Sequence, residues 1–152
     1  MPRGRASKAA LAGRAWSLMF DFLIRSAPQR TRSLAKRGLT PNDSRALFGL
    51  SMDEGRSMRS LANDWQCDPS NATWIVDRLE KLGLAERRSR PDDRRVKLVV
   101  LTAKGQKVRA DLQKEFHLAP AELAALDRGD LEALLRVLEK LISIPAAVSL
   151  LL

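Results

Sequence analysis

Apolar residues at the start of the chain are spread around most of a helical surface. Between Ser7 and about Ala27 they occupy more than one stripe of the predicted helix. These residues are Leu11, Ala15, Leu18, Met19, Phe22 and Leu23. Pro28 is expected to end the helix, because proline lacks a backbone donor and its ring collides with the preceding turn. The next residues, 29–38, are predicted to form a basic connection or short helix that closes at Gly38.

Start signals for helices recur in the middle of the chain. Polar caps and first-turn prolines predict helices at about 41–50, 58–66 and 69–82. The residues that give these signals are Thr40 with Pro41, Ser57, and Asp68 with Pro69. Gly83 permits a left-handed stop for the third helix. Because only a tight turn separates the second helix from the third, the two together predict a helix-turn-helix.

The third of these helices has an apolar face and a polar face. Ile75, Leu79 and Leu82 share one side of the helix and form its core face. Small hydrogen-bonding side chains crowd its start and outer side, from which they can reach base edges in a DNA major groove. The candidate DNA-contacting residues are Ser70, Asn71, Thr73 and Trp74. Capping or plain solvent exposure is the alternative for the polar residues, and packing against a neighbouring hairpin is the alternative for the tryptophan.

Residues 84–102 predict a two-stranded hairpin with the proline-containing turn 89–93 at its tip. The arginines of this tip repel one another in water, whereas the negative potential of a narrow minor groove stabilises closely spaced guanidinium groups. The candidate minor-groove contacts are Arg90, Arg94 and Arg95. Asp92 and Asp93 offset part of the repulsion, and a carboxylate can hold a nearby arginine in one rotamer. A solvated surface turn is the plainer alternative.

Two further helices are predicted after the hairpin. Thr102 caps one over about 103–116, and residues 120–144 are read as a single last helix. In the last helix leucines follow one wide stripe, at Leu131, Leu134, Leu138 and Leu141. A chain of this size has little core left to hide both this stripe and the apolar first helix. Both are therefore expected to pack together and against a second copy of the chain.

The charge of the chain narrows the class of its partner. Its 152 residues, the size of one domain, carry 27 Lys and Arg against 18 Asp and Glu, a formal net charge of +9. This balance favours nucleic acid. An anionic membrane surface fits less well, because the basic residues concentrate on a turn rather than along one face of an amphipathic helix. Arg14 and Asp21 interrupt the first apolar stretch, so no secretion signal is expected, and the apolar tail 141–152 is too short to span a bilayer.

Neither catalysis nor a metal site is indicated. The sequence has no glycine-rich phosphate loop, no paired Cys or His ligands, and no Ser, His and acid grouping in an evident context, so no enzymatic activity and no cofactor are expected. Cys67 is the single cysteine, which excludes an intrachain disulfide and favours a reducing, cytoplasmic location. The Cys67 thiol is expected to be inert. The alternative is a redox sensor, because Cys67 precedes a helix N-terminus. His117 has no partner at metal-ligand spacing and is expected at a helix end or surface.

Two segments of the chain together match the pattern of a known family. The segment "DRRVKLVVLTAKG", Asp93 to Gly105, has an Asp, an intervening residue, an Arg, a hydrophobic strand ending in Leu-Thr, and a Gly three residues later. The segment "CDPSNATWIVDRLEKLGLAERR", residues 67–88, fits a recognition helix and a first wing strand. On these residues, over about 39–105, the chain resembles the MarR (multiple antibiotic resistance regulator) family of bacterial winged-helix transcription factors.

The resemblance implies a mainly α fold with a small β-hairpin wing, in which a winged helix-turn-helix is flanked by N- and C-terminal dimerisation helices. It divides the single domain into residues 7–38, 39–105 and 106–152. A homodimer would bind a near-palindromic operator with half-sites about one helical turn apart. Arg95 would enter the minor groove, oriented by Asp93, and the small polar residues of the recognition helix would face the major groove.

The resemblance also implies an effector. Members of the family often bind small aromatic or phenolic anions between the dimerisation helices and the winged lobe, which weakens DNA binding. The residues of this chain that could line such a pocket are Trp16, Phe20, Arg45 and Phe48. Core packing is the alternative for each of these aromatic residues. In the recognition helix, Trp74 departs from the small or basic residue expected at its position.

The sequence therefore predicts a sequence-specific, double-stranded-DNA-binding transcriptional regulator. It is expected to act as a homodimer, with repression as the usual mode and a small aromatic or phenolic ligand as effector. Two alternatives stay open. One is a winged-helix module that binds RNA or a protein partner, and the other is an architectural DNA binder that loses affinity with salt but not with base changes.

Overall fold

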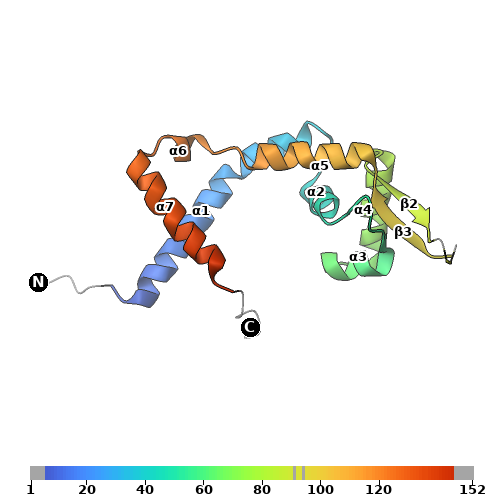
Figure 1. The fold of residues 1–152 in the computed structure, drawn as a ribbon, viewed down its shortest axis with the longest axis horizontal. Coiled ribbons are helices and arrows are strands. Elements are labelled where there is room, and N and C mark those ends of the chain that lie inside the picture. Colours follow the sequence, from blue (N-terminus) through green and yellow to red (C-terminus); the bar gives the residue numbers. More distant parts are fainter. Residues whose placement is uncertain (1–5, 91, 94, 146–152) are drawn as a thin grey trace, which may run out of the picture. The chain divides into compact units, whose positions relative to one another are not determined.

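The fold is that of a computed structural model, which describes residues 6–90, 92–93 and 95–145. These residues are mainly helical with one small antiparallel sheet, so the predicted fold class is confirmed (Figure 1). In chain order the elements are α1 (Lys8–Ala35), α2 (Pro41–Phe48), β1 (Arg56–Ser57), α3 (Met58–Trp65), α4 (Pro69–Lys81), β2 (Ala85–Ser89), β3 (Lys97–Leu101), α5 (Ala103–Phe116), α6 (Ala121–Ala124) and α7 (Arg128–Ser143). Contacts divide the chain into two compact units, Met1–His117 and Leu118–Leu152, each with its own internal packing.

Helix α1 continues through Pro28, so the prediction that this proline ends the helix is wrong. Pro28 cannot donate the backbone hydrogen bond that the Ile24 carbonyl, four residues earlier, would accept, but side chains add hydrogen bonds at the neighbouring carbonyl of Leu23. The carbonyl of Leu23 accepts hydrogen bonds from the Ser26 hydroxyl at 3.0 Å and from the Arg30 guanidinium at 2.9 Å. Beyond the proline, burial of Leu34 in the core holds the last turns helical. Tertiary packing thus overrides the local signal.

The predicted helix caps are present, with one exception. Thr40 and Asp43 form a reciprocal capping box at the start of α2, with hydrogen bonds of 2.8 and 3.2 Å. The Ser57 side chain accepts from the third amide of α3, and Thr102 does the same for α5. Asp68 stands at the N-cap of α4 as expected, but its side chain makes no capping hydrogen bond there. Local capping chemistry therefore sets most of the helix starts.

The predicted two-stranded hairpin is part of a three-stranded sheet of order β1-β3-β2. The two residues of β1 pair antiparallel with β3, as Arg56 opposite Val99 and Ser57 opposite Leu98. Gly55 makes this pairing possible, because a Cβ at that position would lie 2.7 Å from the Cβ of Leu98. A two-residue strand has no periodicity that a sequence pattern could reveal.

The core lies within the first unit, among α2 to α5 and the sheet. Its fully buried side chains include Leu47, Leu61, Leu79, Leu101 and Leu112, one from each of five elements. Burying each of these side chains stabilises the fold by about 1.5–3 kcal/mol. The central strand β3 is buried from Val99 to Leu101.

The C-terminal unit contains two helices where one was predicted. The chain turns after α6, and the Asp127 side chain accepts a hydrogen bond from the Asp130 amide at 2.9 Å, which starts α7 afresh. None of the residues of α7 is buried. Its large exposed apolar side chains are Leu135, Val137, Leu141 and Ile142. This helix therefore presents an apolar surface without cover in a single chain.

In the described part of the chain, no helix combines the length and the apolar character needed to cross a membrane.

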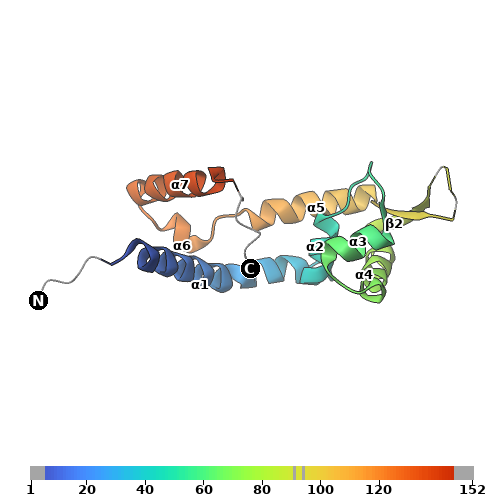
Figure 2. The same ribbon diagram turned by 90° about the horizontal axis from the view of Figure 1, so that it is seen from below.

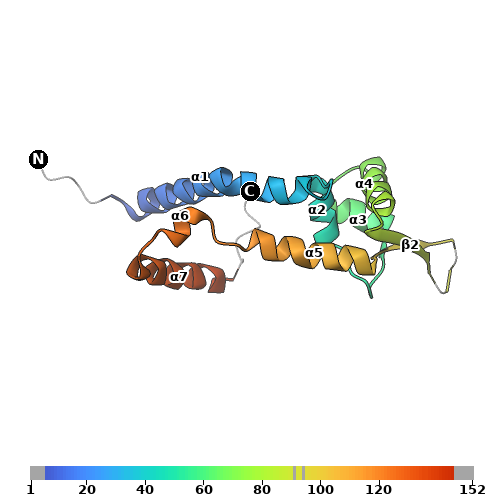
Figure 3. The same ribbon diagram turned by 90° about the horizontal axis from the view of Figure 1, so that it is seen from above.

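An ion pair joins the end of α1 to α5, which run alongside one another (Figures 2 and 3). Arg37 binds the carboxylate of Glu115 with both terminal nitrogens, at 2.5 and 3.2 Å. Hydrogen bonding from Arg37, and secondarily from Ser33, lowers the pKa of Glu115 from its ordinary 4.5 to about 2. A carboxylate with a depressed pKa stabilises the folded state above its unfolded-state pKa.

Acidification is therefore expected to weaken this clamp. The free energy of unfolding should lose the contribution of Glu115 as the pH falls from about 4.5 to about 2. Glu115→Gln should lower stability at neutral pH and converge with the parent near pH 2. Urea titrations across this pH range measure the effect, with Glu132→Gln, at a far more exposed ion pair, as the control. A parent and a Glu115→Gln variant that differ equally at every pH would contradict the expectation.

Candidate nucleic-acid interface

The helix-turn-helix consists of α3, a tight turn and α4. Gln66 takes a left-handed conformation at φ 52° and ends α3, and the Cys67 amide then bonds to the Ala62 carbonyl at 3.0 Å. Leu61 and Trp65 of α3 are buried against the core. The predicted motif is thus present, with a non-glycine residue in the conformation that glycine usually takes.

Helix α4 separates its side chains as a recognition helix does. Its inner residues, Ala72, Ile75, Val76 and Leu79, are all buried. The predicted DNA-contacting residues Ser70, Asn71, Thr73 and Trp74 are all exposed, as is Asp77. The Thr73 hydroxyl donates to the Pro69 carbonyl at 2.8 Å, so its oxygen remains available as an acceptor. The exposed face of α4 therefore combines short polar groups with one indole.

Trp74 is held by a neighbour on its own helix. The guanidinium of Arg78 lies over its ring, 5.2 Å from the ring centroid. The same guanidinium pairs with Asp43 of α2 at 2.9 Å. Burial alone would raise the pKa of Asp43, but hydrogen bonds from Arg78 and Thr40 outweigh it and hold that pKa below its ordinary value. This buried carboxylate is therefore charged at neutral pH.

The wing extends beyond the helices of the lobe (Figure 3). Arg90 pairs with Asp92 at 2.6 Å, and this hydrogen bond lowers the pKa of the Asp92 carboxyl. Asp93 accepts a hydrogen bond from the backbone amide of Arg95 at 3.0 Å, so it fixes the turn while the Arg95 side chain stays exposed. The predicted contact at Arg94 lies outside the described residues.

A further ion-pair cluster ties the base of the wing to α4. Arg87 of β2 pairs with Asp77 at 2.7 Å and with Glu80, and its backbone amide also donates to Glu80 at 2.8 Å. Sequence reasoning missed this cluster and the Asp43–Arg78 pair. The sequence does carry a signal for the Arg87 cluster, because Asp77 and Glu80 are three residues apart on α4 and Arg87 follows on the next strand.

The four residues expected to line an effector pocket occupy separate places. Trp16 and Phe20 lie with ring centroids 6.4 Å apart on the exposed part of α1. Phe48 packs against Phe116 at 6.0 Å, whereas Arg45 lines a small pocket with Asn71. In the described residues of one chain, these four side chains do not meet in a single cavity.

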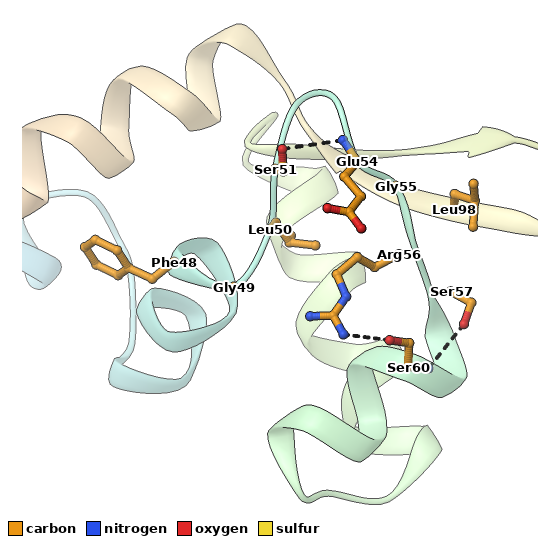
Figure 4. A pocket seen from close by; sticks show the side chains of 10 residues that line it. All are labelled: Phe48, Gly49, Leu50, Ser51, Glu54, Gly55, Arg56, Ser57, Ser60 and Leu98. Atoms are coloured by element: carbon orange, nitrogen blue, oxygen red, sulfur yellow. Dashed lines mark hydrogen bonds between the residues drawn. The ribbon is translucent and has the colours of Figure 1, made fainter. Parts of the chain in front are cut away.

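Phe48 stands at the edge of a pocket in the lobe of about 490 Å³. Figure 4 shows the Glu54 carboxylate and the Arg56 guanidinium directed into this space. Arg56 donates to the Ser60 hydroxyl at 2.6 Å and pairs with Asp64 at 2.5 Å. Its charge is already satisfied within the protein.

Two residues considered in the sequence have ordinary surroundings. Cys67 is half buried against the core at the turn of the motif. His117 is exposed at the end of α5. Within the described ranges no three His, Cys, Asp or Glu residues are grouped as a metal site would require.

The positive charge is concentrated in the unit that holds α4 and the wing. Residues 118–152 contain three basic and five acidic residues, so the excess of positive charge lies entirely in residues 1–117. Within that unit, residues 1–38 carry nine basic residues and one acid, and the wing segment 84–97 carries six basic residues and three acids. The local excess on the wing complements a phosphate backbone.

This geometry defines a winged helix-turn-helix protein. The family model described as MarR matches residues 39–97, and the resemblance found in the sequence is thereby confirmed. A search of curated proteins with the sequence found no significant match.

Solved structures share the fold over most of the chain. YusO from Bacillus subtilis is 22% identical with a TM-score of 0.73, covering 91% of this chain and 99% of YusO. The multiple antibiotic-resistance repressor MarR from Listeria monocytogenes is 20% identical with a TM-score of 0.76, covering 90% and 95%. MepR from S. aureus, in a complex with DNA, is 21% identical with a TM-score of 0.68, covering 84% and 97%.

Proposed function

We propose that this protein is a sequence-specific, double-stranded-DNA-binding transcriptional regulator. The observation that carries the proposal is the exposed face of α4, where short polar side chains stand outward while every apolar residue except Trp74 is buried. Such a face can enter a major groove and read base edges. The exposed Arg95 of the wing, together with Arg90 and Arg94, would reach the adjacent minor groove. The structure of MepR with DNA supports this use of the fold.

The regulator acts as a homodimer in this proposal. Helices α1 and α7 each carry large apolar side chains that stay exposed in one chain. Exposed apolar surface of this extent marks a protein interface. A two-fold dimer would present two α4 helices to the half-sites of a near-palindromic operator. In this dimer, each protomer has a winged lobe at residues 39–105, and the helices before and after it, at 7–38 and 106–152, form the dimer interface.

Repression with release by a small aromatic or phenolic ligand completes the proposal. A dimer seated on an operator blocks access of polymerase to the DNA, which is the simplest regulatory effect. Phe48 and Arg45 each border a pocket of the lobe, and Trp16 and Phe20 offer aromatic surface on α1. Selection of duplexes from a random pool, followed by a screen for small molecules that release them, tests both parts. Protein that retains no duplex at low salt would refute DNA binding.

Substitutions in the wing and in the recognition helix should change DNA binding in different ways. Arg95→Ala is expected to weaken binding to every duplex and to lower the salt slope by about 1, because one cation near the DNA backbone is lost. Asn71→Ala should instead relax base preference at one position, by about 1–3 kcal/mol. Titrations of the selected site and single-base variants at several salt concentrations separate the two effects.

Lys114→Ala provides the matched control, because it removes an exposed cation near the end of α5, away from α4, the wing and the apolar faces of α1 and α7. Its affinity and salt slope should remain those of the parent. If Arg95→Ala and Asn71→Ala also bind the selected site like the parent, the assignment of these contacts is wrong.

A further inference from the structure

Arg78 is a cation on the recognition helix whose contacts all lead into the protein. Its guanidinium donates to both carboxylate oxygens of Asp43, at 2.9 to 3.3 Å, and to the Gly38 carbonyl at 3.0 Å. Its flat face lies against the ring of Trp74. With the edge formed by Nε and Nη2 and one face both occupied, Arg78 has Nη1 left to offer to a phosphate.

The carboxylate that holds Arg78 is itself fixed. Asp43 is fully buried, and it also accepts the Thr40 amide at 2.8 Å as part of the capping box of α2. A buried carboxylate with three donors has no freedom to follow a moving partner. The position of the Arg78 guanidinium is thus set by α2 and by the turn before it, not by α4 alone.

Trp74 is large, half exposed and restrained. Its side chain is 53% accessible on the outer face of α4, beside Asn71 and Thr73. While the indole is exposed to water, its apolar surface contributes no free energy of burial. Because the side chain is already restrained, it loses little conformational entropy when a partner covers it. Its free surface is an apolar plane, which matches the C–H face of a deoxyribose rather than a base edge.

We propose that Asp43 and Arg78 are positioning residues that hold the Trp74 indole as a contact for the sugar–phosphate backbone at the edge of the major groove. The inference rests on the proposed function and deepens it, because it assigns affinity to a triad that spans α2 and α4. Arg78 acts through Trp74 and touches no DNA. Lysine cannot replace it, since lysine has neither the two-pronged edge for Asp43 nor the flat face for the ring.

A double-mutant cycle on the full-length protein and its selected duplex tests the inference. Trp74→Ala is expected to weaken binding about tenfold, as loss of an aromatic anchor does. Arg78→Lys should weaken it several-fold without changing the salt slope. The double variant should bind no more weakly than Trp74→Ala alone, because Arg78 has nothing left to position. Trp74→Phe, which keeps a flat ring, should restore most of the affinity.

Two further variants separate positioning from folding. Asp43→Asn keeps the shape of the side chain and should reproduce the Arg78→Lys loss, again with no added loss in the Trp74→Ala background. Arg37→Lys breaks a comparable arginine–carboxylate clamp away from α4 and should lower stability while leaving the affinity unchanged. Urea unfolding of each variant confirms that folded protein is compared.

The outcomes discriminate between roles. Losses that add in the double variant, or an Arg78→Lys salt slope lowered by about 1, would make Arg78 a direct phosphate contact and overturn the inference. Trp74→Ala that binds like the parent would also overturn it. A parent that binds no duplex overturns the proposed function and the inference together, whereas a parent that binds while the losses add overturns the inference alone.

Discussion

Gly105→Ala is expected to prevent the winged lobe from folding stably. A Cβ at position 105 would lie 1.9 Å from the carbonyl oxygen and 2.8 Å from the carbonyl carbon of Leu84. Both atoms belong to the backbone, so no side-chain rotation relieves the overlap. The Leu84 carbonyl also accepts the Thr102 amide at 3.1 Å, which holds the start of β2 against the start of α5. Separating these elements should cost more than about 4 kcal/mol.

Urea unfolding followed by circular dichroism measures this loss. Gly13→Ala is the matched control, because a Cβ at Gly13 meets nothing within 4 Å and alanine favours an exposed helix interior by about 1 kcal/mol. The two alanine substitutions should therefore change stability in opposite directions. A Gly105→Ala variant with the unfolding midpoint of the parent would show that the elements are not packed as described.

Phe20→Asp is expected to convert the dimer into a monomer and to reduce affinity for a two-half-site operator at least about 100-fold. The Phe20 side chain is 51% exposed on α1, next to Trp16 and close to Leu23 and Ile24, which are also exposed. A carboxylate placed in an apolar interface would be desolvated without a partner. Once the halves separate, binding at one half-site no longer raises the effective concentration at the other.

Sedimentation velocity and operator titration report the two effects together. Lys8→Asp supplies the control, because it adds an acid to an exposed polar position at the start of the same helix. It should leave both the mass and the affinity unchanged. A Phe20→Asp protein that still sediments as a dimer would place the interface elsewhere on the molecule.

Signals within a few residues of one another explain most of what could be predicted from the sequence. Thr40, Ser57 and Thr102 cap their helices because the acceptor and the amide are three positions apart. The apolar face of α4 follows from helical spacing, and the same spacing predicts which of its residues are exposed. The outward face of the recognition helix was therefore visible before the fold was known.

What escaped prediction depends on residues far apart in the chain. Helix α1 survives Pro28 because of packing beyond it, and β1 forms only because β3 lies beside Gly55. The Asp43–Arg78 pair joins positions 35 residues apart, and either residue alone resembles an ordinary surface charge. Sequence patterns carry no information on such pairings until the topology is available.

The short pairing of β1 with β3 joins the wing and the helix-turn-helix into one rigid unit. Strand β1, which leads into α3, is hydrogen-bonded to β3, which leads out of the wing tip. The wing and α4 would therefore move along DNA only together. In the proposed complex, an operator half-site must therefore keep the distance between its two groove segments fixed. Inserting one base pair between them shifts one segment by about 3.4 Å and turns it by roughly a tenth of a revolution. The proposed regulator would therefore respond to the spacing between the two groove segments as well as to their base sequence.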